Sequence, residues 1–337
     1  MKQILLATTA LVMTAGVAAA EISFSGYAEM GIVGGGDDAG DRGGHTGGEV
    51  EFHNDLNLIV TMTSETDTGL AFGASVEISK DEGDSNGNFS ADNEAAFISG
   101  AFGTLTMGEI DGAMDWAITE NVGNPGSIGD DETEHAGYFG AFGDGVFDNQ
   151  IARYEYSFGD FGVAVSAELE DDYYNEDGEL IGEGKGDNYA VGLKYKGDFG
   201  GFGMGFGLGY QKTSIYDAGL DAVKIGNVEL LGASVTADFN NGFVAGIAYT
   251  DIDAEDEADG NHLGLSAGYT TGAFEIGANY GQFDIDGADK VKGYGIAAAY
   301  DLGGGLKAHV GYGDSDYGDN APDGDYETYS VGVSMSF

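Results

Sequence analysis

Hydrophobic positions recur at every second residue along most of this chain. In the stretch FGMGFGLGY at 202–210, five large apolar residues alternate with four glycines. The same alternation runs through FVAGIAY at 243–249, FEIGANY at 274–280 and YGIAAAY at 294–300. Successive side chains of a β-strand point to opposite faces, so this period predicts strands that each have one apolar face.

Aromatic residues stand at both ends of these apolar rows, with smaller aliphatic residues between them. Amphipathic rings favour the two interfaces of a bilayer. The opposite face is polar or bare, as in Glu275, Gly277 and Asn279. A soluble β-sandwich also alternates, but it has no reason to border its core with aromatic residues. The pattern therefore favours an all-β, transmembrane antiparallel β-barrel.

The last strand, YSVGVSMSF at 329–337, ends on an aromatic residue and alternates apolar residues with serine and glycine. A membrane barrel must make all its backbone hydrogen bonds between strands, so we expect this strand to pair with ISFSGYAEMGI at 22–32. Its apolar row would face lipid and its Ser/Gly row the lumen. A terminal Phe337 at this spacing also resembles the signal that the outer-membrane barrel assembly machinery reads.

A coarse division of the sequence predicts about sixteen strands, an even number in the size range that leaves a water channel. They are expected at 22–33, 50–63, 69–79, 91–100, 102–109, 150–157, 160–169, 187–196, 201–212, 227–239, 242–251, 261–270, 273–283, 290–301, 305–313 and 327–337. Short turns such as NNG and TTG alternate with longer acidic loops, as at the periplasmic and external ends of outer-membrane barrels. One domain, 21–337, is predicted.

Composition narrows the class of partners and the chemistry. The 337 residues include 12 Lys+Arg and 59 Asp+Glu, a formal net charge of -47, and no Cys. Nucleic acid is excluded as a partner because its phosphates demand a basic surface. Disulfides, thiolate catalysis and zinc–thiolate sites are excluded by the lack of cysteine.

The first twenty residues have the layout of a signal peptide. Lys2 precedes the apolar stretch ILLATTALVMTAGV, and alanines at 18–20 supply a small-residue cleavage site. We expect residues 1–20 to be removed and the mature protein to begin at Glu21, outside the inner membrane.

One predicted connection, about 110–149, is far longer than a usual loop. It holds the only tryptophan, Trp116, and its stretch DGAMDWAITE predicts a helical turn. Apolar residues among its acids, such as Met114 and Phe142, indicate that it packs on another part of the protein.

The hairpin AAFISGAFGTLTMGE, the long connection after it and the following DNQIARYEYSFGDFGVAVSAEL resemble general bacterial porins of the alphaproteobacterial type. The resemblance extends over essentially the whole mature chain. It implies a sixteen-stranded barrel, usually a homotrimer, in contact with outer-membrane lipid and lipopolysaccharide. It also implies that the third external loop, here about 110–149, folds into the lumen and narrows it, so that small hydrophilic solutes diffuse through passively.

Carried over to this sequence, the constriction would contain loop acids and a few basic wall residues. The candidates are Glu109, Asp111, Asp115, Glu120, Asp130, Asp131, Glu132 and Glu134, with Arg153 and His309. Charged walls concentrate counter-ions, so we predict cation selectivity. Strand parity puts few other basic side chains inside (Lys194, Lys196, Lys307 and His53), so the basic side of the constriction is thin. The alternative is that the carboxylates are merely solvated.

The sequence also raises the questions of a bound metal ion, an enzymatic activity and a different kind of β protein. Asp251, Asp253 and Asp256 are candidate Ca²⁺ ligands, although they match no EF-hand register and could equally form a repulsive acidic rim. No cofactor is required and no enzyme is predicted: the glycines of GDFGGFGMGFGLGY are followed by no helix, so they form a bare lumen wall or a surface on which another segment lies. The main alternative is a non-conducting structural or adhesive outer-membrane barrel. A secreted Ca²⁺-binding β-roll would need a nine-residue glycine repeat that the sequence lacks.

Overall fold

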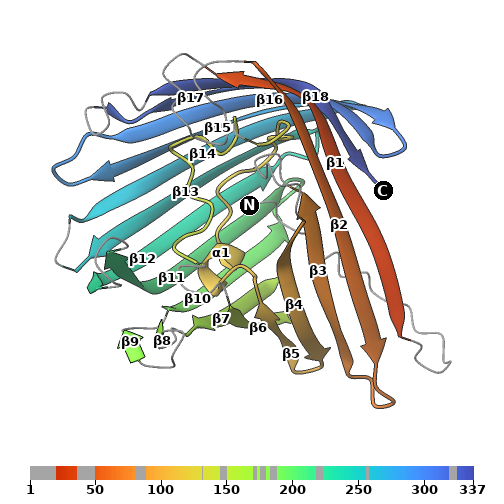
Figure 1. The fold of residues 1–337 in the computed structure, drawn as a ribbon, viewed down its shortest axis with the longest axis vertical. Coiled ribbons are helices and arrows are strands. Elements are labelled where there is room, and N and C mark those ends of the chain that lie inside the picture. Colours follow the sequence, from red (N-terminus) through yellow and green to blue (C-terminus); the bar gives the residue numbers. More distant parts are fainter. Residues whose placement is uncertain are drawn as a thin grey trace.

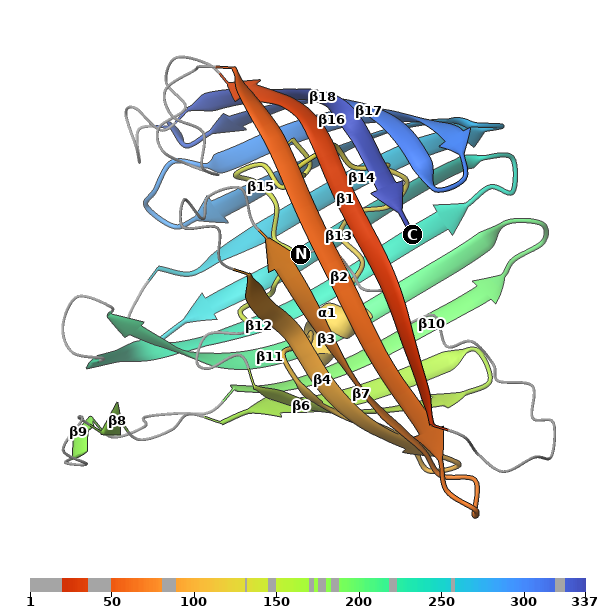
Figure 2. The same ribbon diagram turned by 45° about the vertical axis from the view of Figure 1, so that its right-hand side comes forward.

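The computed structural model describes residues 20–35, 50–80, 89–130, 132–144, 150–169, 173–174, 180–182, 188–217, 223–255, 258–318 and 325–337. These residues form a closed antiparallel barrel of sixteen strands (Figures 1 and 2). The predicted signal peptide lies outside the described residues, except for Ala20.

The barrel strands follow one another around the ring in chain order. They are β1 (Glu21–Gly35), β2 (Glu51–Glu65), β3 (Ala71–Lys80), β4 (Ser90–Gly100), β5 (Gly103–Gly108), β6 (Ile151–Phe158), β7 (Phe161–Glu168), β10 (Asn188–Asp198), β11 (Gly203–Asp217), β12 (Val223–Asp238), β13 (Phe243–Ala254), β14 (Gly260–Thr271), β15 (Phe274–Ile285), β16 (Val291–Gly303), β17 (Leu306–Asp316) and β18 (Tyr326–Ser336). All the predicted strands are thereby confirmed. A two-stranded hairpin, β8 (Tyr173–Tyr174) with β9 (Leu180–Gly182), was not predicted, because strands of two and three residues are too short to show a period.

The last strand closes the ring on the first, as the sequence predicts. Tyr27 is paired with Ser336 and Gly31 with Gly332. Beyond the last paired residue, the backbone N–H of Phe337 donates to Gly26 O at 2.9 Å. The terminal aromatic residue is therefore hydrogen-bonded at the seam of the barrel, where β18 meets β1.

The two faces of the strands differ as the alternation predicts. Leu231 and Val331 point outward and are 60% and 51% exposed, whereas Ser330 on the inner face is 1% exposed. Aromatic rings gather at both ends of the outer face: the rings of Phe158 and Phe161 stack 5.7 Å apart at one end, and those of Tyr294 and Tyr312 lie 6.3 Å apart at the other.

The long connection between β5 and β6 runs through the inside of the ring (Figures 1 and 2). We call its described residues 109–144 the inner loop. It carries the predicted helical turn as α1 (Ala113–Ala117), which contacts β7, β10 and β11. A buried apolar cluster forms between this loop and the wall, and it includes Met114, Phe142, Leu230 and Ala248. No helix in the described part of the chain is long and apolar enough to cross a bilayer.

Candidate functional site

Glycines on the inner wall allow the backbone of the inner loop to lie directly against the strands. A Cβ added at Gly192 would lie 2.0 Å from Ala113 O, and one added at Gly281 would lie 1.8 Å from Gly137 O. We call the residues of this kind the glycine track: Gly192, Gly207, Gly268, Gly277, Gly281 and Gly295. Of the two interpretations offered for the FGMGFGLGY stretch, Gly207 fits the docking surface. Gly203 fits the bare wall, since a Cβ there would meet only Asp238, whose nearest atom, Cβ, would be 3.6 Å away.

Serine hydroxyls on the wall accept hydrogen bonds from backbone N–H groups of the loop. Ser166 Oγ on β7 accepts from Ala113 N at 2.8 Å, and Ser234 Oγ on β12 accepts from Thr119 N at 3.0 Å. Ser266 Oγ on β14 and Ser315 Oγ on β17 accept from Val122 N and Ala136 N at 2.9 and 3.0 Å. The irregular backbone of the loop therefore finds partners on the wall, as buried N–H groups require.

A lysine of the wall strand β10 contacts helix α1. Lys194 Nζ on β10 lies 3.4 Å from the centroid of the Trp116 ring and donates to Trp116 O at 3.4 Å. A Cβ added at Gly162 of β7 would lie 2.9 Å from the same ring. Lys194 points inward as predicted, but its charge is engaged by the inner loop.

Three of the predicted constriction acids lie buried between loop and wall. Glu120 accepts the N–H of Phe139 at 3.0 Å and lies 3.4 Å from His262 Nε2. Burial raises the pKa of Glu120 to about 8. Burial, reinforced by the charges of Asp111 and Asp144, raises the pKa of Asp115 to about 9. Burial therefore favours the neutral forms of these two carboxyls. The third acid, Glu132, is 1% exposed and accepts a hydrogen bond from the Ser127 hydroxyl.

The remaining acids of the prediction are more accessible. Glu109, Asp111 and Asp130 are half-buried, and Glu134 is exposed. Asp131 lies outside the described residues. His135, which is not among the predicted constriction residues, is buried beside the loop acids. Burial, aided by the nearby His262, lowers its pKa to about 4.

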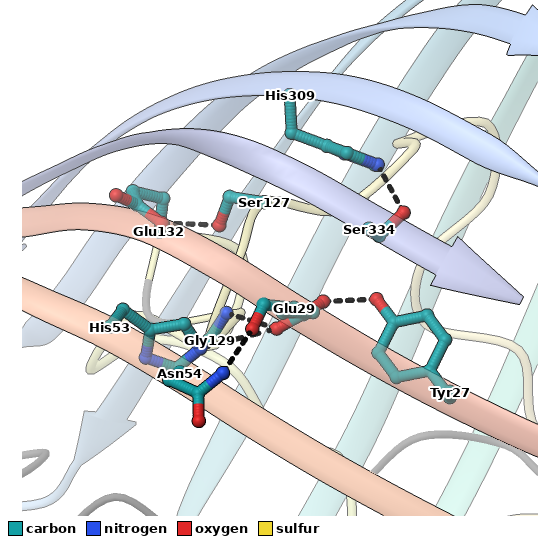
Figure 3. A network of polar contacts seen from close by, with 9 residues as sticks. All are labelled: Tyr27, Glu29, His53, Asn54, Ser127, Gly129, Glu132, His309 and Ser334. Carbon is teal, nitrogen blue, oxygen red and sulfur yellow. Dashed lines mark hydrogen bonds and ion pairs between the residues drawn. The ribbon is translucent and has the colours of Figure 1, made fainter.

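The tip of the inner loop reaches the seam of the barrel (Figure 3). There, Glu29 Oε2 on β1 accepts the N–H of Gly129 at 2.9 Å, while His309 Nδ1 on β17 lies 3.0 Å from Gly126 O. The predicted residue His309 is thus at the loop, whereas Glu29 was missed. Strand parity could have found it, because a carboxylate breaks the inward row that also contains Ser23, Ser25 and Tyr27.

Arg153 on β6 is the predicted basic residue of the constriction. Its Nη1 donates to Asp111 O at 2.5 Å, and its Nε lies 3.6 Å from Glu155 Oε2. The guanidinium is therefore held at the root of the inner loop, between a carbonyl and a carboxylate.

Carboxylates that the sequence reasoning missed line the wall formed by β3 and β4. Asn93, at a left-handed φ of 53°, donates from Nδ2 to Glu77 Oε2 at 3.0 Å and from its backbone N–H to Glu109 Oε2 at 2.6 Å. Asp92 accepts from the hydroxyls of Ser79 and Ser90 at 2.8 and 2.7 Å. Within β2–β5, all of whose residues are described, the only Lys or Arg is Lys80, and the register puts it in the outward row with Leu56.

The acids predicted to bind Ca²⁺ lie elsewhere. Asp251 and Asp253 are exposed, and the register places them in the outward row, paired with Leu231 and Glu229. Asp256 lies outside the described residues. Among the described residues, no three His, Asp or Glu side chains lie close enough together to hold a metal ion, so this site stays a prediction.

Comparisons with known proteins agree with the geometry. The family model described as "Gram-negative porin" matches residues 7–337. A porin of Rhodobacter capsulatus is 31% identical over 314 residues, which cover 88% of this chain and 95% of that protein. A porin structure refined at 1.8 Å resolution superposes with a TM-score of 0.69 at 27% identity, covering 94% of this chain and all of the other. A variant of Rhodopseudomonas blastica porin, at 21% identity and the same coverage, gives a TM-score of 0.67 and supports the fold alone.

Proposed function

This chain belongs to the Gram-negative porin family and is an outer-membrane porin, and we propose that it lets small hydrophilic solutes and ions diffuse passively and prefers cations. The inner loop is bound to the walls of β7, β12, β14 and β17 and to the seam, so the proposed path runs along β2–β6.

The charges along that path support the preference for cations. Glu77 and Asp92 on the wall stand with Glu109 and Asp111 at the root of the loop, whereas Arg153 is paired with Glu155. A lumen lined with carboxylates raises the local concentration of cations. The buried loop acids contribute less, because burial favours their neutral forms.

Single-channel recording in a planar bilayer with a KCl gradient tests this proposal. We expect conductance steps and a cation-selective reversal potential, and we expect Glu77→Gln with Asp92→Asn to move that potential toward zero. Glu275→Gln is the matched control, because Glu275 lies on the inner face of β15 and is paired with Lys307 at 2.8 Å. Anion preference of the unmodified protein would refute the cation filter. Silence of folded protein would instead support the non-conducting structural or adhesive barrel.

A homotrimer is part of the proposal. The outward face of β1–β3 lacks the tyrosines found on other strands and has an apolar groove of about 430 Å³. Its large apolar lining residues are Phe24, Leu56, Leu58, Ile78, Phe89 and Phe337. We expect Leu56→Arg to convert trimers to monomers on unheated gels, whereas Leu231→Arg on β12, well away around the ring, should leave them intact.

A further inference from the structure

We propose that Glu29 and His309 form a two-point latch that positions the tip of the inner loop and thereby sets the cross-section of the pore. The tip is defined as residues 126–130 together with Glu132. This inference rests on the proposed function, because it assigns to the latch the size limit of the same channel.

The first point of the latch is a buried carboxylate. Glu29 is 1% exposed, and its Oε2 accepts the N–H of Gly129 at 2.9 Å while its Oε1 accepts the hydroxyl of Tyr27 (Figure 3). His53 Nε2 on β2 lies 3.4 Å from Oε2. One carboxyl group thus contacts the loop tip and lies against a side chain of β2, so its removal would free the Gly129 N–H from its partner on the wall.

The second point is an imidazole with a defined direction. A carbonyl can only accept, so His309 Nδ1 must donate to Gly126 O at 3.0 Å. The other nitrogen, Nε2, lies 2.9 Å from Ser334 Oγ on β18, and in the neutral ring it accepts from that hydroxyl. The imidazole is therefore oriented by the wall strand and presents its N–H to the loop.

An apolar contact lies between the two points. Ile128 is fully buried, and a Cβ added at Gly31 of β1 or Gly332 of β18 would lie 2.5 or 2.6 Å from Ile128 Cδ1. Inside the tip, the Ser127 hydroxyl donates to Glu132. Two polar contacts and one buried side chain thus attach residues 126–129 to the strands β1, β18 and β17, and the carbonyl of Glu132 lies against Gly295 of β16.

The tip lies far along the chain from both ends of the loop, so its placement depends on the latch. Gly129 lies 21 residues after Gly108, the end of β5, and 22 before Ile151, the start of β6. It is therefore about as far as the loop allows from both strands that hold its roots. Gly126 and Gly129 have φ of 77° and 74°, so the tip has no regular secondary structure of its own to resist displacement. Contacts with the wall must then determine how far the tip extends into the lumen.

The test compares Glu29→Ala with Glu29→Gln, which retains an acceptor oxygen for Gly129. In Glu29→Ala we expect an about tenfold rise in the time spent at irregular conductance levels and a changed cut-off for polymers of graded size. Glu29→Gln should restore most of both, as a purely structural lesion would not. Glu275→Ala serves as the control, since Glu275 contacts Lys307 rather than the loop tip.

A second readout does not depend on conduction. The chain has no cysteine, so Glu134→Cys introduces a single thiol. A nitroxide spin label therefore attaches at that position alone. We expect its spectrum to sharpen in Glu29→Ala and in His309→Ala, and to remain unchanged in Glu275→Ala. Unchanged spectra and unchanged conductance in Glu29→Ala would overturn the latch. If the folded protein conducts no current but Glu29→Ala still makes the label more mobile, the proposed function is refuted and the latch is retained.

Discussion

Replacing Gly192 by alanine should displace helix α1 from the wall while leaving the barrel intact. The added Cβ would lie 2.0 Å from Ala113 O, and real Cβ contacts do not fall below 3.0 Å, so the helix must move by at least 3.0 − 2.0 = 1.0 Å. Ala113 is fully buried and its N–H donates to Ser166 at 2.8 Å, so that displacement disturbs a packed contact and a hydrogen bond together.

The expected cost follows from the size of this clash. Overpacking of a buried site costs about 1–3 kcal/mol, and in this barrel it falls on loop docking, because the strands pair independently of α1. Since 1.4 kcal/mol is a factor of ten, a cost of about 1–3 kcal/mol changes a two-state ratio by roughly 5- to 160-fold. The population of undocked loop should therefore rise by about that factor.

Trp116 provides the assay, since it is the only tryptophan and belongs to α1. We expect Gly192→Ala to shift its emission to longer wavelength and to increase quenching by acrylamide. Heat-modifiable migration on gels should stay unchanged and show that the barrel has folded. Gly203→Ala on the inner face of β11 is the matched control, because its Cβ would meet Asp238 Cβ only at an ordinary 3.6 Å. Emission and quenching of Gly192→Ala equal to those of Gly203→Ala would refute docking on the glycine track.

Three further predictions use the same protein. Burial raises the pKa of Glu120 from 4.5 to about 8, so docking of the loop should weaken as pH rises from 4.5 through 8, and Glu120→Gln should remove that part of the pH profile of Trp116 quenching. Burial lowers the pKa of His135 from 6.5 to about 4, so docking should also weaken as pH falls from 6.5 to 4; a His135→Asn profile that keeps the full acid-side loss would contradict this. Val331→Lys on the outward face of β18 should destabilise the barrel in lipid vesicles by about 2–4 kcal/mol in urea unfolding, whereas equal stability would mean that this face does not meet the bilayer core.

The strands were predictable because their signal is local. An alternation of two residues needs only the segment itself, and the rows of β13, β15 and β16 show it plainly. Closure was predictable from one general requirement, that a barrel in lipid leaves no edge, combined with the apolar row ending at Phe337. The hairpin β8–β9 offered no comparable length of pattern.

The path of the inner loop was not predictable in the same way. Gly129 and Glu29 are 100 residues apart, and His309 and Gly126 are 183 apart, so no local pattern announces either contact. The sequence reasoning therefore listed Asp115, Glu120 and Glu132 as lumen charges, whereas the structure buries all three against the loop or wall. It also missed Glu77 and Asp92, because which inward carboxylates face the open path depends on the wall that the loop leaves uncovered, and long-range contacts decide that.

The inward residues of the wall become intelligible once the loop is in place. A glycine stands where a loop carbonyl comes close, as at Gly281 and Gly295, since any side chain there would displace the loop backbone. A serine stands where a loop N–H needs an acceptor, as at Ser234 and Ser266. The Ser/Gly face of these strands, which resembles featureless lumen lining in the sequence, is thus an imprint of the loop. In a porin of this design, the inward row of each strand should record whether the loop lies over it. Strands outside that path, such as β2 and β3, can carry charged side chains instead, and these are the charges to which we attribute the proposed preference for cations.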